Sequence, residues 1–265
     1  MNTINLIEHE NGIVDIRLNR AEIHNAFDDQ MIAELIKTFD ALAEDESIRV
    51  AILSAEGKSF SAGADLNWMR RMADYDEEEN YQDSMQLAQC MYSLYSLPFP
   101  VIAKVQGAAF GGGVGLVSCC DIAIASERAS FCLSEVKLGL IPAVISPYVI
   151  KAIGERHAMR YFTTAEKFKA DRAREIGLIS EIVTDDELDN SVMQLATTIA
   201  MNGPEAVRHA KMLIENVAGK EISGSLRHKT AQIIAEVRAS EQGKEGVAAF
   251  LSKRKPDWQE PEDVQ

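Results

Sequence analysis

Two short segments of small residues could present bare main chain to a ligand. They are FSAGADL (60–66) and AFGGGVGL (109–116), and each follows an apolar run that is typical of a buried strand. Turns at the carboxyl ends of buried strands are where α/β proteins place many of their sites. Two backbone N–H groups that point from such turns at one spot stabilise negative charge developing on a carbonyl oxygen. The pattern indicates an oxyanion hole, and close packing of strands on helices is the other explanation of the glycines.

The segment FCLSEVKLGLIP (131–142) surrounds Glu135 with apolar and small residues. A carboxyl group in such surroundings resists ionisation, and a pKa raised toward neutrality suits proton transfer. Glu135 is therefore a candidate acid–base catalyst, with an ordinary surface ion pair to Lys137 as the alternative. The GGGVGL segment lacks both the lysine of a P-loop and the GxGxxG register, and the sequence has no GxSxG motif. Neither a phosphate-binding loop nor a serine nucleophile is supported.

The composition of the 265-residue chain is that of an ordinary globular protein, with 46% hydrophobic and 26% charged residues. The formal net charge of −14 opposes binding to a nucleic-acid backbone. No apolar run is long enough to predict a membrane span, and the N-terminus has no signal-peptide pattern. We expect a cytoplasmic protein without a metal site, whose cysteines are reduced and buried because they show neither CxxC nor metal-ligand spacing. The four cysteines are Cys90, Cys119, Cys120 and Cys132.

Hydrophobic periodicity divides the chain into an α/β part and a helical part. Alternating or continuous apolar runs predict strands at 12–19, 50–55, 101–109 and 121–126. Apolar positions three and four residues apart predict helices at 31–45, 78–97, 149–162, 169–178, 187–202, 204–218 and 225–240. Strands that alternate with helices imply an α/β layered core. We assign residues 1–198 to this core and residues 199–265 to a C-terminal helical region.

Four ordered motifs together resemble the crotonase, or enoyl-CoA hydratase/isomerase, superfamily. They are FSAGADL (60–66), AFGGGVGLVSCCDIAIAS (109–126), FCLSEVKLGLIP (131–142) and AREIGLISEIV (173–183). The resemblance runs from about residue 5 to residue 258. It implies the crotonase fold of repeated β-β-α turns, acyl-CoA thioester substrates and no separate cofactor. It also implies trimers or dimers of trimers, which makes residues 199–265 a helical trimerisation region.

The same resemblance assigns roles to individual residues. The oxyanion hole corresponds to the backbone amides of Ala64 and Gly112, and Glu135 corresponds to a catalytic glutamate of the family. Further residues match family positions that contact the acyl group or the CoA moiety: Ala62, Asp65, Leu66, Gly111, Gly115, Phe250 and Lys253. The basic run at 253–255 suits the CoA phosphates, or it is a solvated tail.

Gly115 departs from the two-glutamate hydratases of the family, which have a glutamate at this position. A lone Glu135 favours a one-base reaction such as double-bond isomerisation, because hydration must both activate water and protonate a carbon. Longer segments, however, resemble the bacterial methylglutaconyl-CoA hydratases and the carboxygeranoyl-CoA-type hydratases of terpenoid breakdown. We therefore expect hydration of a branched enoyl-CoA in leucine or terpenoid catabolism, with Gly115 leaving room for the methyl branch.

The expected substrate carries a distal carboxylate, for which a cation near the acyl pocket is needed. Candidates are Arg70, Arg71 and Lys151, although a solvated helix face explains each of them as well. Alternatives within the enzyme class are an enoyl-CoA isomerase and a hydratase of straight-chain enoyl-CoA. Outside it, the fold could serve RNA binding, which the acidic balance opposes, or a non-catalytic assembly subunit.

Overall fold

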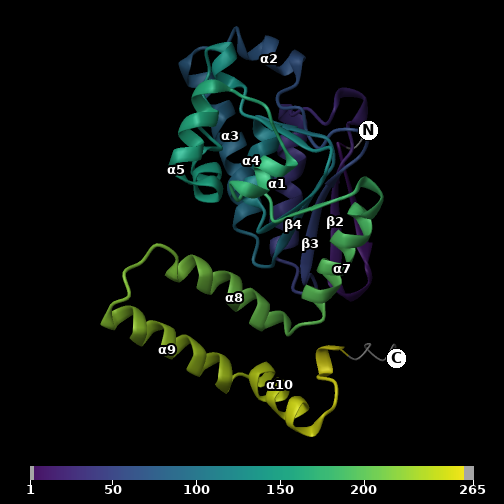
Figure 1. The fold of residues 1–265 in the computed structure, drawn as a ribbon, viewed down its shortest axis with the longest axis vertical. Coiled ribbons are helices and arrows are strands. Elements are labelled where there is room, and N and C mark those ends of the chain that lie inside the picture. The colour runs from purple at the N-terminus through teal and green to yellow at the C-terminus, as the bar shows by residue number, and fades with distance from the viewer. Residues whose placement is uncertain (1–2, 260–265) are drawn as a thin grey trace.

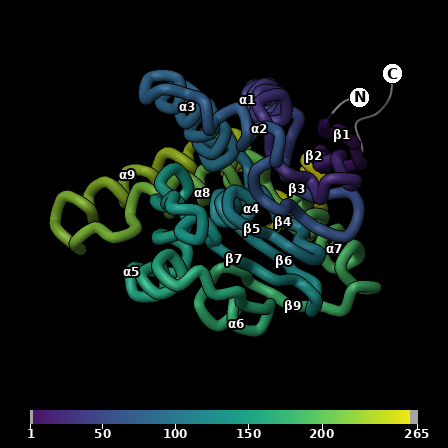
Figure 2. The backbone as a smooth tube through the Cα atoms, turned by 90° about the horizontal axis from the view of Figure 1, so that it is seen from above, coloured from purple at the N-terminus to yellow at the C-terminus, as the bar shows by residue number. Residues whose placement is uncertain are grey.

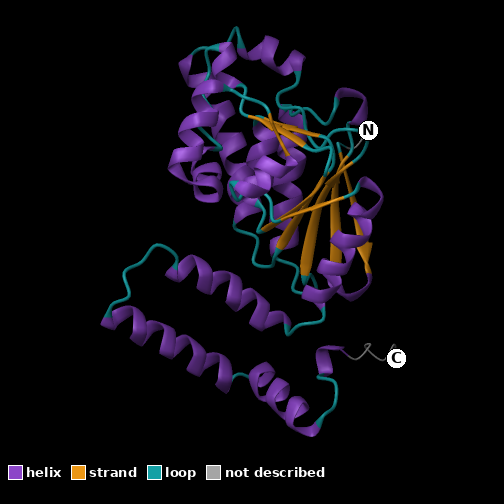
Figure 3. Cartoon of the chain, viewed as in Figure 1, coloured by secondary structure: helices purple, strands orange, loops and turns teal. Residues whose placement is uncertain are grey.

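Two β-sheets and the helices around them form the body of the protein (Figure 3). The structure is a computed structural model that describes residues 3–259, so residues 1–2 and the last six residues of the predicted C-terminal region lie outside the described chain. The larger sheet has the order β1 (Ile4–His9), β2 (Ile13–Leu18), β3 (Val50–Ala55), β4 (Val101–Val105), β6 (Ile122–Ser126) and β9 (Glu181–Val183). All neighbours in it are parallel except β1 and β2. The smaller sheet has the order β5 (Ala108–Phe110), β7 (Ser130–Cys132) and β8 (Phe168–Lys169).

Ten α-helices are assigned in the described chain (Figure 1). The first five are α1 (Asp29–Ala43), α2 (Leu66–Met72), α3 (Glu77–Tyr95), α4 (Gly112–Cys119) and α5 (Ser146–Thr164). The others are α6 (Ala170–Glu175), α7 (Leu188–Ala200), α8 (Pro204–Val217), α9 (Gly224–Ala239) and α10 (Glu241–Ser252). A short 3₁₀ helix (Glu135–Leu138) separates β7 from α5.

Each repeat of the chain adds one strand to the large sheet and one strand to the small sheet, and then forms a helix. In one turn β4 enters the large sheet, β5 the small sheet, and α4 follows; in the next, β6 and β7 are followed by α5. Earlier segments of the chain pair in a similar way through two isolated β-bridges, one between Phe27 and Ala64 and one between Ser61 and Ala109. The predicted α/β class with repeated β-β-α turns is confirmed.

Helices cover both faces of the large sheet. On one face α1, α3, α4 and α5 contribute to the main apolar core. On the other, buried side chains of α7 pack against the sheet, as Val192 and Ala196 do with Ile52 and Ile102. α7 is thus the last helix held by the sheet, and the predicted boundary at 198/199 falls in its final turn.

The last three helices project from this core, and α8 is tied to it by Arg208, which donates to the Ile48 carbonyl oxygen, and by Lys211, which pairs with Asp121. α8 and α9 have no buried residue, and α10 buries Ala249. Figure 1 shows the three helices below the sheets, and Figure 2 shows α8 and α9 extending beyond the edge of the core. In the described chain no helix has the length and apolar character needed to cross a membrane.

Candidate active site

The two small-residue turns that the sequence singles out lie side by side. Ser61 pairs with Ala109, and the Phe110 amide donates to the Ser61 carbonyl oxygen at 2.8 Å. Gly63 (φ +97°) and Gly111 (φ +50°) both have backbone conformations that favour glycine. A Cβ atom on Gly63 would lie 3.5 Å from the Phe110 carbonyl oxygen. The glycines therefore allow the two turns to approach at backbone distance.

The pairing of Phe27 sets the direction of the Ala64 amide. The Phe27 amide donates to the Gly63 carbonyl oxygen, and the Asp65 amide donates to the Phe27 carbonyl oxygen, both at 2.7 Å. Because N–H groups alternate sides along an extended backbone, the amide of Ala64 points away from Phe27. Ala64 is exposed. Its N–H is therefore available to a bound molecule.

The Gly112 amide is available for a different reason. Gly112 is the first residue of α4, where the N–H groups have no acceptor within the helix. It is half-buried, whereas Gly111 and Gly113 are buried. Among the hydrogen bonds of residues 3–259, none is donated by the amide of Ala64 or Gly112. The positive end of the α4 dipole adds to the attraction for a negative oxygen at this point.

Phe27 lies between the two available amides, and nothing in the sequence pattern pointed to it. Its backbone pairs with Ala64, while a Cβ atom on Gly112 would lie 3.0 Å from Cε2 of its ring. Phe27 is almost completely buried, at 2% exposure. Phe27 therefore acts as a spacer between the turn at residues 63–65 (Gly-Ala-Asp, the GAD turn) and the start of α4.

Glu135 brings a carboxyl group to the same place. A Cβ atom on Gly111 would lie 3.3 Å from Oε1 of Glu135. The Gly111 amide donates to the Cys132 carbonyl oxygen at 2.9 Å, which fixes the glycine turn to the strand that precedes Glu135. Oε2 of Glu135 is buried and has no hydrogen-bond partner in the described chain. Burial raises the pKa of Glu135, as its apolar sequence context predicts.

This geometry is found together with a family match over nearly the whole chain. A family model described as enoyl-CoA hydratase/isomerase matches residues 8–261. The chain belongs to this family. A putative enoyl-CoA hydratase of Thermus thermophilus is 32% identical over 95% of the chain and 99% of its own length. The 2,3-dehydroadipyl-CoA hydratase of Escherichia coli is 30% identical over 96% of the chain and 97% of its own length.

Solved structures of the family share the fold. A putative enoyl-CoA hydratase/isomerase (crotonase) of Legionella pneumophila is 49% identical, with a TM-score of 0.94 over 97% of this chain and 99% of that one. An enoyl-CoA hydratase of Shewanella pealeana is 46% identical, with a TM-score of 0.92 over 97% and 96% of the two chains. The protein thus has the crotonase fold expected from its motifs.

Gly115 does not provide the room that we expected for a methyl branch. A Cβ atom on Gly115 would overlap the Cγ2 methyl of Ile145 and lie 3.3 Å from Cε of Met91. Gly115, Ile145 and Met91 are all buried. The missing side chain is therefore replaced by Ile145 of the loop before α5, and position 115 contributes neither a carboxyl group nor open space to this family member.

The other residues that we predicted to contact the substrate near the GAD turn are either exposed or have a structural role. Ala62 is exposed, and its amide donates to the His24 carbonyl oxygen at 2.9 Å. Leu66 is 69% exposed at the start of α2. Asp65 is buried and caps α2 by accepting hydrogen bonds from the amides of Asn67 and Trp68.

Phe250 and Lys253 are not brought to this site within one chain. They lie at the end of α10, which packs on α8 and α9. Figure 1 places α10 at the opposite end of the molecule from α2. Phe250 is 81% exposed.

Two of the three candidate cations lie on α2, in its last turn. The Arg70 guanidinium donates to the side-chain oxygen of Asn67 at 2.8 Å. Arg71 forms an ion pair with Asp29 at 2.5 Å. Both groups are largely exposed, which fits the solvated-face alternative.

The third candidate, Lys151, belongs to another part of the molecule. Its ammonium group hydrogen-bonds the Tyr95 hydroxyl and lies 4.7 Å from the centre of that ring. It lines a cavity of about 520 Å³ that also includes Cys119 and Asp121, at the carboxyl end of α4. Lys151 is thus at the opposite end of α4 from Gly112.

Three of the four cysteines are buried, as predicted, and none of the four is in a disulfide bond. Cys90, Cys119 and Cys132 are buried, and Cys120 is half-buried. Burial raises the pKa of the Cys90 thiol to about 12, which leaves it in its unreactive protonated form. Within residues 3–259 no three metal-ligating side chains gather into a cluster.

Proposed function

We propose that the protein adds water to the 2,3 double bond of a branched enoyl-CoA, converting 3-methylglutaconyl-CoA to 3-hydroxy-3-methylglutaryl-CoA. The observation that carries the proposal is the half-buried Glu135, whose Oε2 atom is buried without a hydrogen-bond partner in the described chain and whose Oε1 atom lies against Gly111. It stands beside two turns that leave the amides of Ala64 and Gly112 without acceptors in the described chain. The branched substrate is supported by the resemblance of long segments of the sequence to methylglutaconyl-CoA hydratases.

In this mechanism the thioester carbonyl oxygen accepts hydrogen bonds from the amides of Ala64 and Gly112. Ionised Glu135 takes a proton from water as the oxygen of that water attacks C3. The electron pair of the double bond moves to C2 and the carbonyl, giving an enolate whose negative oxygen the two amides stabilise. Glu135 then returns its proton to C2, so that one water is added and the carboxylate is restored. A raised pKa suits a group that must both accept and donate a proton near neutral pH.

A distal carboxylate on the substrate is consistent with one relative. The 30% identical Escherichia coli protein is named for a dehydroadipyl ester, which derives from a dicarboxylic acid. For this chain, Arg70 is the preferred cation, because it contacts the neutral side chain of Asn67 while Arg71 is paired with Asp29. Binding of the distal carboxylate by Arg70 would charge-assist the hydrogen bonds at that end of the acyl group.

Isomerisation of an enoyl-CoA is the second candidate, and a specific observation favours it. Because residue 115 is glycine and Ile145 fills the space that a side chain there would need, no second carboxyl group from that position accompanies Glu135. Moving a double bond requires one base that takes a proton from one carbon and returns it to another. This reaction uses the same two amides to hold the dienolate oxygen.

Product mass separates the two functions. Purified protein is incubated with branched and straight-chain enoyl-CoA esters, and the products are analysed by mass spectrometry. We expect the branched ester to gain the mass of one water, whereas an isomer would keep its mass.

Glu135→Gln should lower kcat by about 10²-fold or more, the usual contribution of general acid–base catalysis. Lys137→Gln, in the same 3₁₀ helix but exposed, is the matched control and should keep full activity. Near-normal hydration by Glu135→Gln would refute the role of the carboxyl group.

We also propose that the chain assembles as a trimer or a dimer of trimers through its C-terminal helices. Support comes from exposed apolar side chains on α8–α10 and the segment that joins α8 to α9. They are Met212, Ile214, Ile222, Ile234, Val247, Phe250 and Leu251. Apolar groups on this scale are costly to leave in water and are usual at subunit interfaces. In the assembly, Phe250 and Lys253 of one subunit contact the CoA bound to another.

A further inference from the structure

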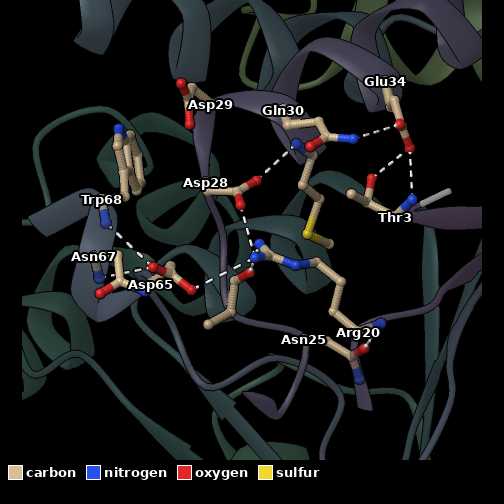
Figure 4. A network of polar contacts seen from close by, with 12 residues as sticks. Thr3, Arg20, Asn25, Asp28, Asp29, Gln30, Glu34, Asp65, Asn67 and Trp68 are labelled. Carbon is tan, nitrogen blue, oxygen red and sulfur yellow. Dashed lines mark hydrogen bonds and ion pairs between the residues drawn. The ribbon is translucent and has the colours of Figure 1, made fainter. Parts of the chain in front are cut away.

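Arg20 joins the two chain segments that meet at the Phe27–Ala64 bridge (Figure 4). Its Nη2 atom lies 2.7 Å from Oδ2 of Asp28 and 3.5 Å from Oδ2 of Asp65. Its Nη1 atom donates to the Ala26 carbonyl oxygen at 2.8 Å. A single guanidinium group thus binds both segments, and its planar shape fixes its donors in one geometry.

Each of the two carboxylates also caps a helix. Oδ1 of Asp28 accepts from the amide of Met31 at the start of α1, at 2.8 Å. Oδ1 of Asp65 accepts from the amides of Asn67 and Trp68 at the start of α2. Because one oxygen of each carboxylate holds a helix and the other faces Arg20, the arginine locks the starts of α1 and α2 to each other.

The ion pairs are largely shielded from water. The side chains of Arg20, Asp28 and Asp65 are 16%, 17% and 11% exposed. Loss of one partner from a shielded pair leaves an uncompensated charge, which is far more disruptive than the loss of a surface pair. Without the guanidinium, two carboxylates that now share one nitrogen would face each other and repel. The repulsion would act directly on the residues that follow Phe27 and Ala64.

The main chain of Arg20 is anchored as well. Its amide donates to Oδ1 of Asn25 at 2.8 Å. Asn25 and the preceding His24 both have left-handed backbone conformations, with φ of 52° and 56°. The turn that carries Phe27 is therefore held in a sparsely populated geometry by this network.

We infer that Arg20 is a positioning residue for the reaction: it sets the orientation of the Ala64 amide and its distance from the Gly112 amide. The inference rests on the proposed function of these two amides. Its physical basis is that Asp65 follows Ala64 directly, while the ring of Phe27, next to Asp28, touches Gly112. A shift of about 1 Å in such a site can cost about 10²-fold in rate.

Arg17 offers a matched control in the preceding strand. It also pairs with two carboxylates, Asp15 at 2.5 Å and Glu56 at 3.0 Å, and its side chain is 28% exposed. It lies on β2 rather than at the bridge. Arg17→Gln therefore removes two comparable ion pairs and leaves the carboxylates of Asp28 and Asp65 paired with Arg20.

The decisive measurement is the infrared carbonyl band of bound crotonyl-CoA labelled with ¹³C at the thioester carbonyl. Hydrogen bonds from two amides polarise this carbonyl and lower its stretching frequency. Glu135→Gln is used as the parent because its turnover of the ester should be slow enough for the bound ester to be observed. We expect the carbonyl frequency of the ester bound to the parent to be lower than that of free crotonyl-CoA. Adding Arg17→Gln to the parent should leave this frequency unchanged. Adding Arg20→Gln should make the lowering smaller. In the otherwise native enzyme, Arg20→Gln should reduce kcat by about tenfold or more with KM nearly unchanged. Arg17→Gln should leave both constants near their native values.

Arg20→Lys keeps the charge but has one nitrogen for three acceptors. The carbonyl frequency of bound crotonyl-CoA in this variant, and its kcat, should therefore lie between the values for Arg20 and for Arg20→Gln. This variant also serves if Arg20→Gln does not fold. A native carbonyl frequency and native kcat in the Arg20 variants would overturn the inference and leave the proposed function intact. Absence of any lowering in the parent, with Arg20 in place, would overturn the role of the amides and the inference with it.

Discussion

The Glu135 carboxyl group occupies a position where ionisation costs free energy. Burial raises its pKa, and Oε2 has no partner within the described chain to offset the cost. The folded protein therefore binds a proton on Glu135 at pH values where the unfolded chain, with an ordinary glutamate pKa of about 4.3, has lost it. Stability contributed by this group is then full at low pH and falls as the pH rises toward the raised pKa.

A glutamine at position 135 removes this pH dependence. Glu135→Gln should be more resistant to urea than the native protein at neutral pH, because the glutamine never has to be buried as an anion. Below the ordinary glutamate pKa of about 4.3 the two proteins should be equally stable. Urea unfolding followed by circular dichroism between these pH values checks the sign. A native protein that is the more stable of the two at neutral pH would contradict a raised pKa.

At the residue scale, the sequence predicts what depends on local context. The apolar neighbours of Glu135 are enough to predict its raised pKa, and the small residues of FSAGADL and AFGGGVGL predict exposed main chain. Phe27 and Ile145 could not be found in the same way. Each acts by touching a glycine that is distant in the sequence, Gly112 or Gly115, and no local pattern encodes such a contact.

At the scale of elements, periodicity locates the long helices and buried strands but not the places where the chain changes sheet. The run 101–109 is predicted as one strand and forms two, β4 and β5. They are separated at Gly107 (φ +68°), where a Cβ atom would overlap the Lys58 carbonyl oxygen. The edge strand β1 and the short helix α2 are also missed. Both have many exposed side chains and so lack a sustained apolar pattern.

Packing of α4 on α5 depends on the absence of a side chain at Gly115. Gly115→Ala should destabilise the protein by about 1–3 kcal/mol, because the new methyl group overlaps Ile145. Ile145→Ala alone should cost about 2–5 kcal/mol through the cavity it leaves. In the double variant the added methyl fills part of that cavity, so the two losses should not add.

Denaturant unfolding of the two single variants and the double variant measures this coupling. The control is Gly115→Ala combined with Ile153→Ala, which removes a buried side chain of α5 about two turns beyond Ile145. The control pair should be additive to within about 0.5 kcal/mol. Additive losses for Gly115 and Ile145 as well would contradict the view that Ile145 occupies the space above Gly115.

At the scale of the whole molecule, the C-terminal helices explain why one chain does not display its complete predicted site. α8 and α9 bury no residue of their own, and α10 places Phe250 and Lys253 far from the GAD turn. Motif matching assigns these residues to CoA without saying which subunit's CoA they contact. The fold supplies the reason to choose a neighbour, because exposed apolar helices that project from a core are suited to packing against another copy.

Mixed assemblies test this arrangement. Lys253→Ala should raise KM for the enoyl-CoA and leave kcat unchanged, because a phosphate contact far from the reacting carbons stabilises substrate and transition state equally. Co-expression of Lys253→Ala chains with the strongly impaired Glu135→Gln chains should yield some sites that combine an intact Glu135 with an intact Lys253 from the neighbour. These sites should show the native KM at a fraction of the native kcat. If Lys253 served the CoA of its own chain, every active site in the mixture would lack it, and KM would stay as high as in Lys253→Ala alone.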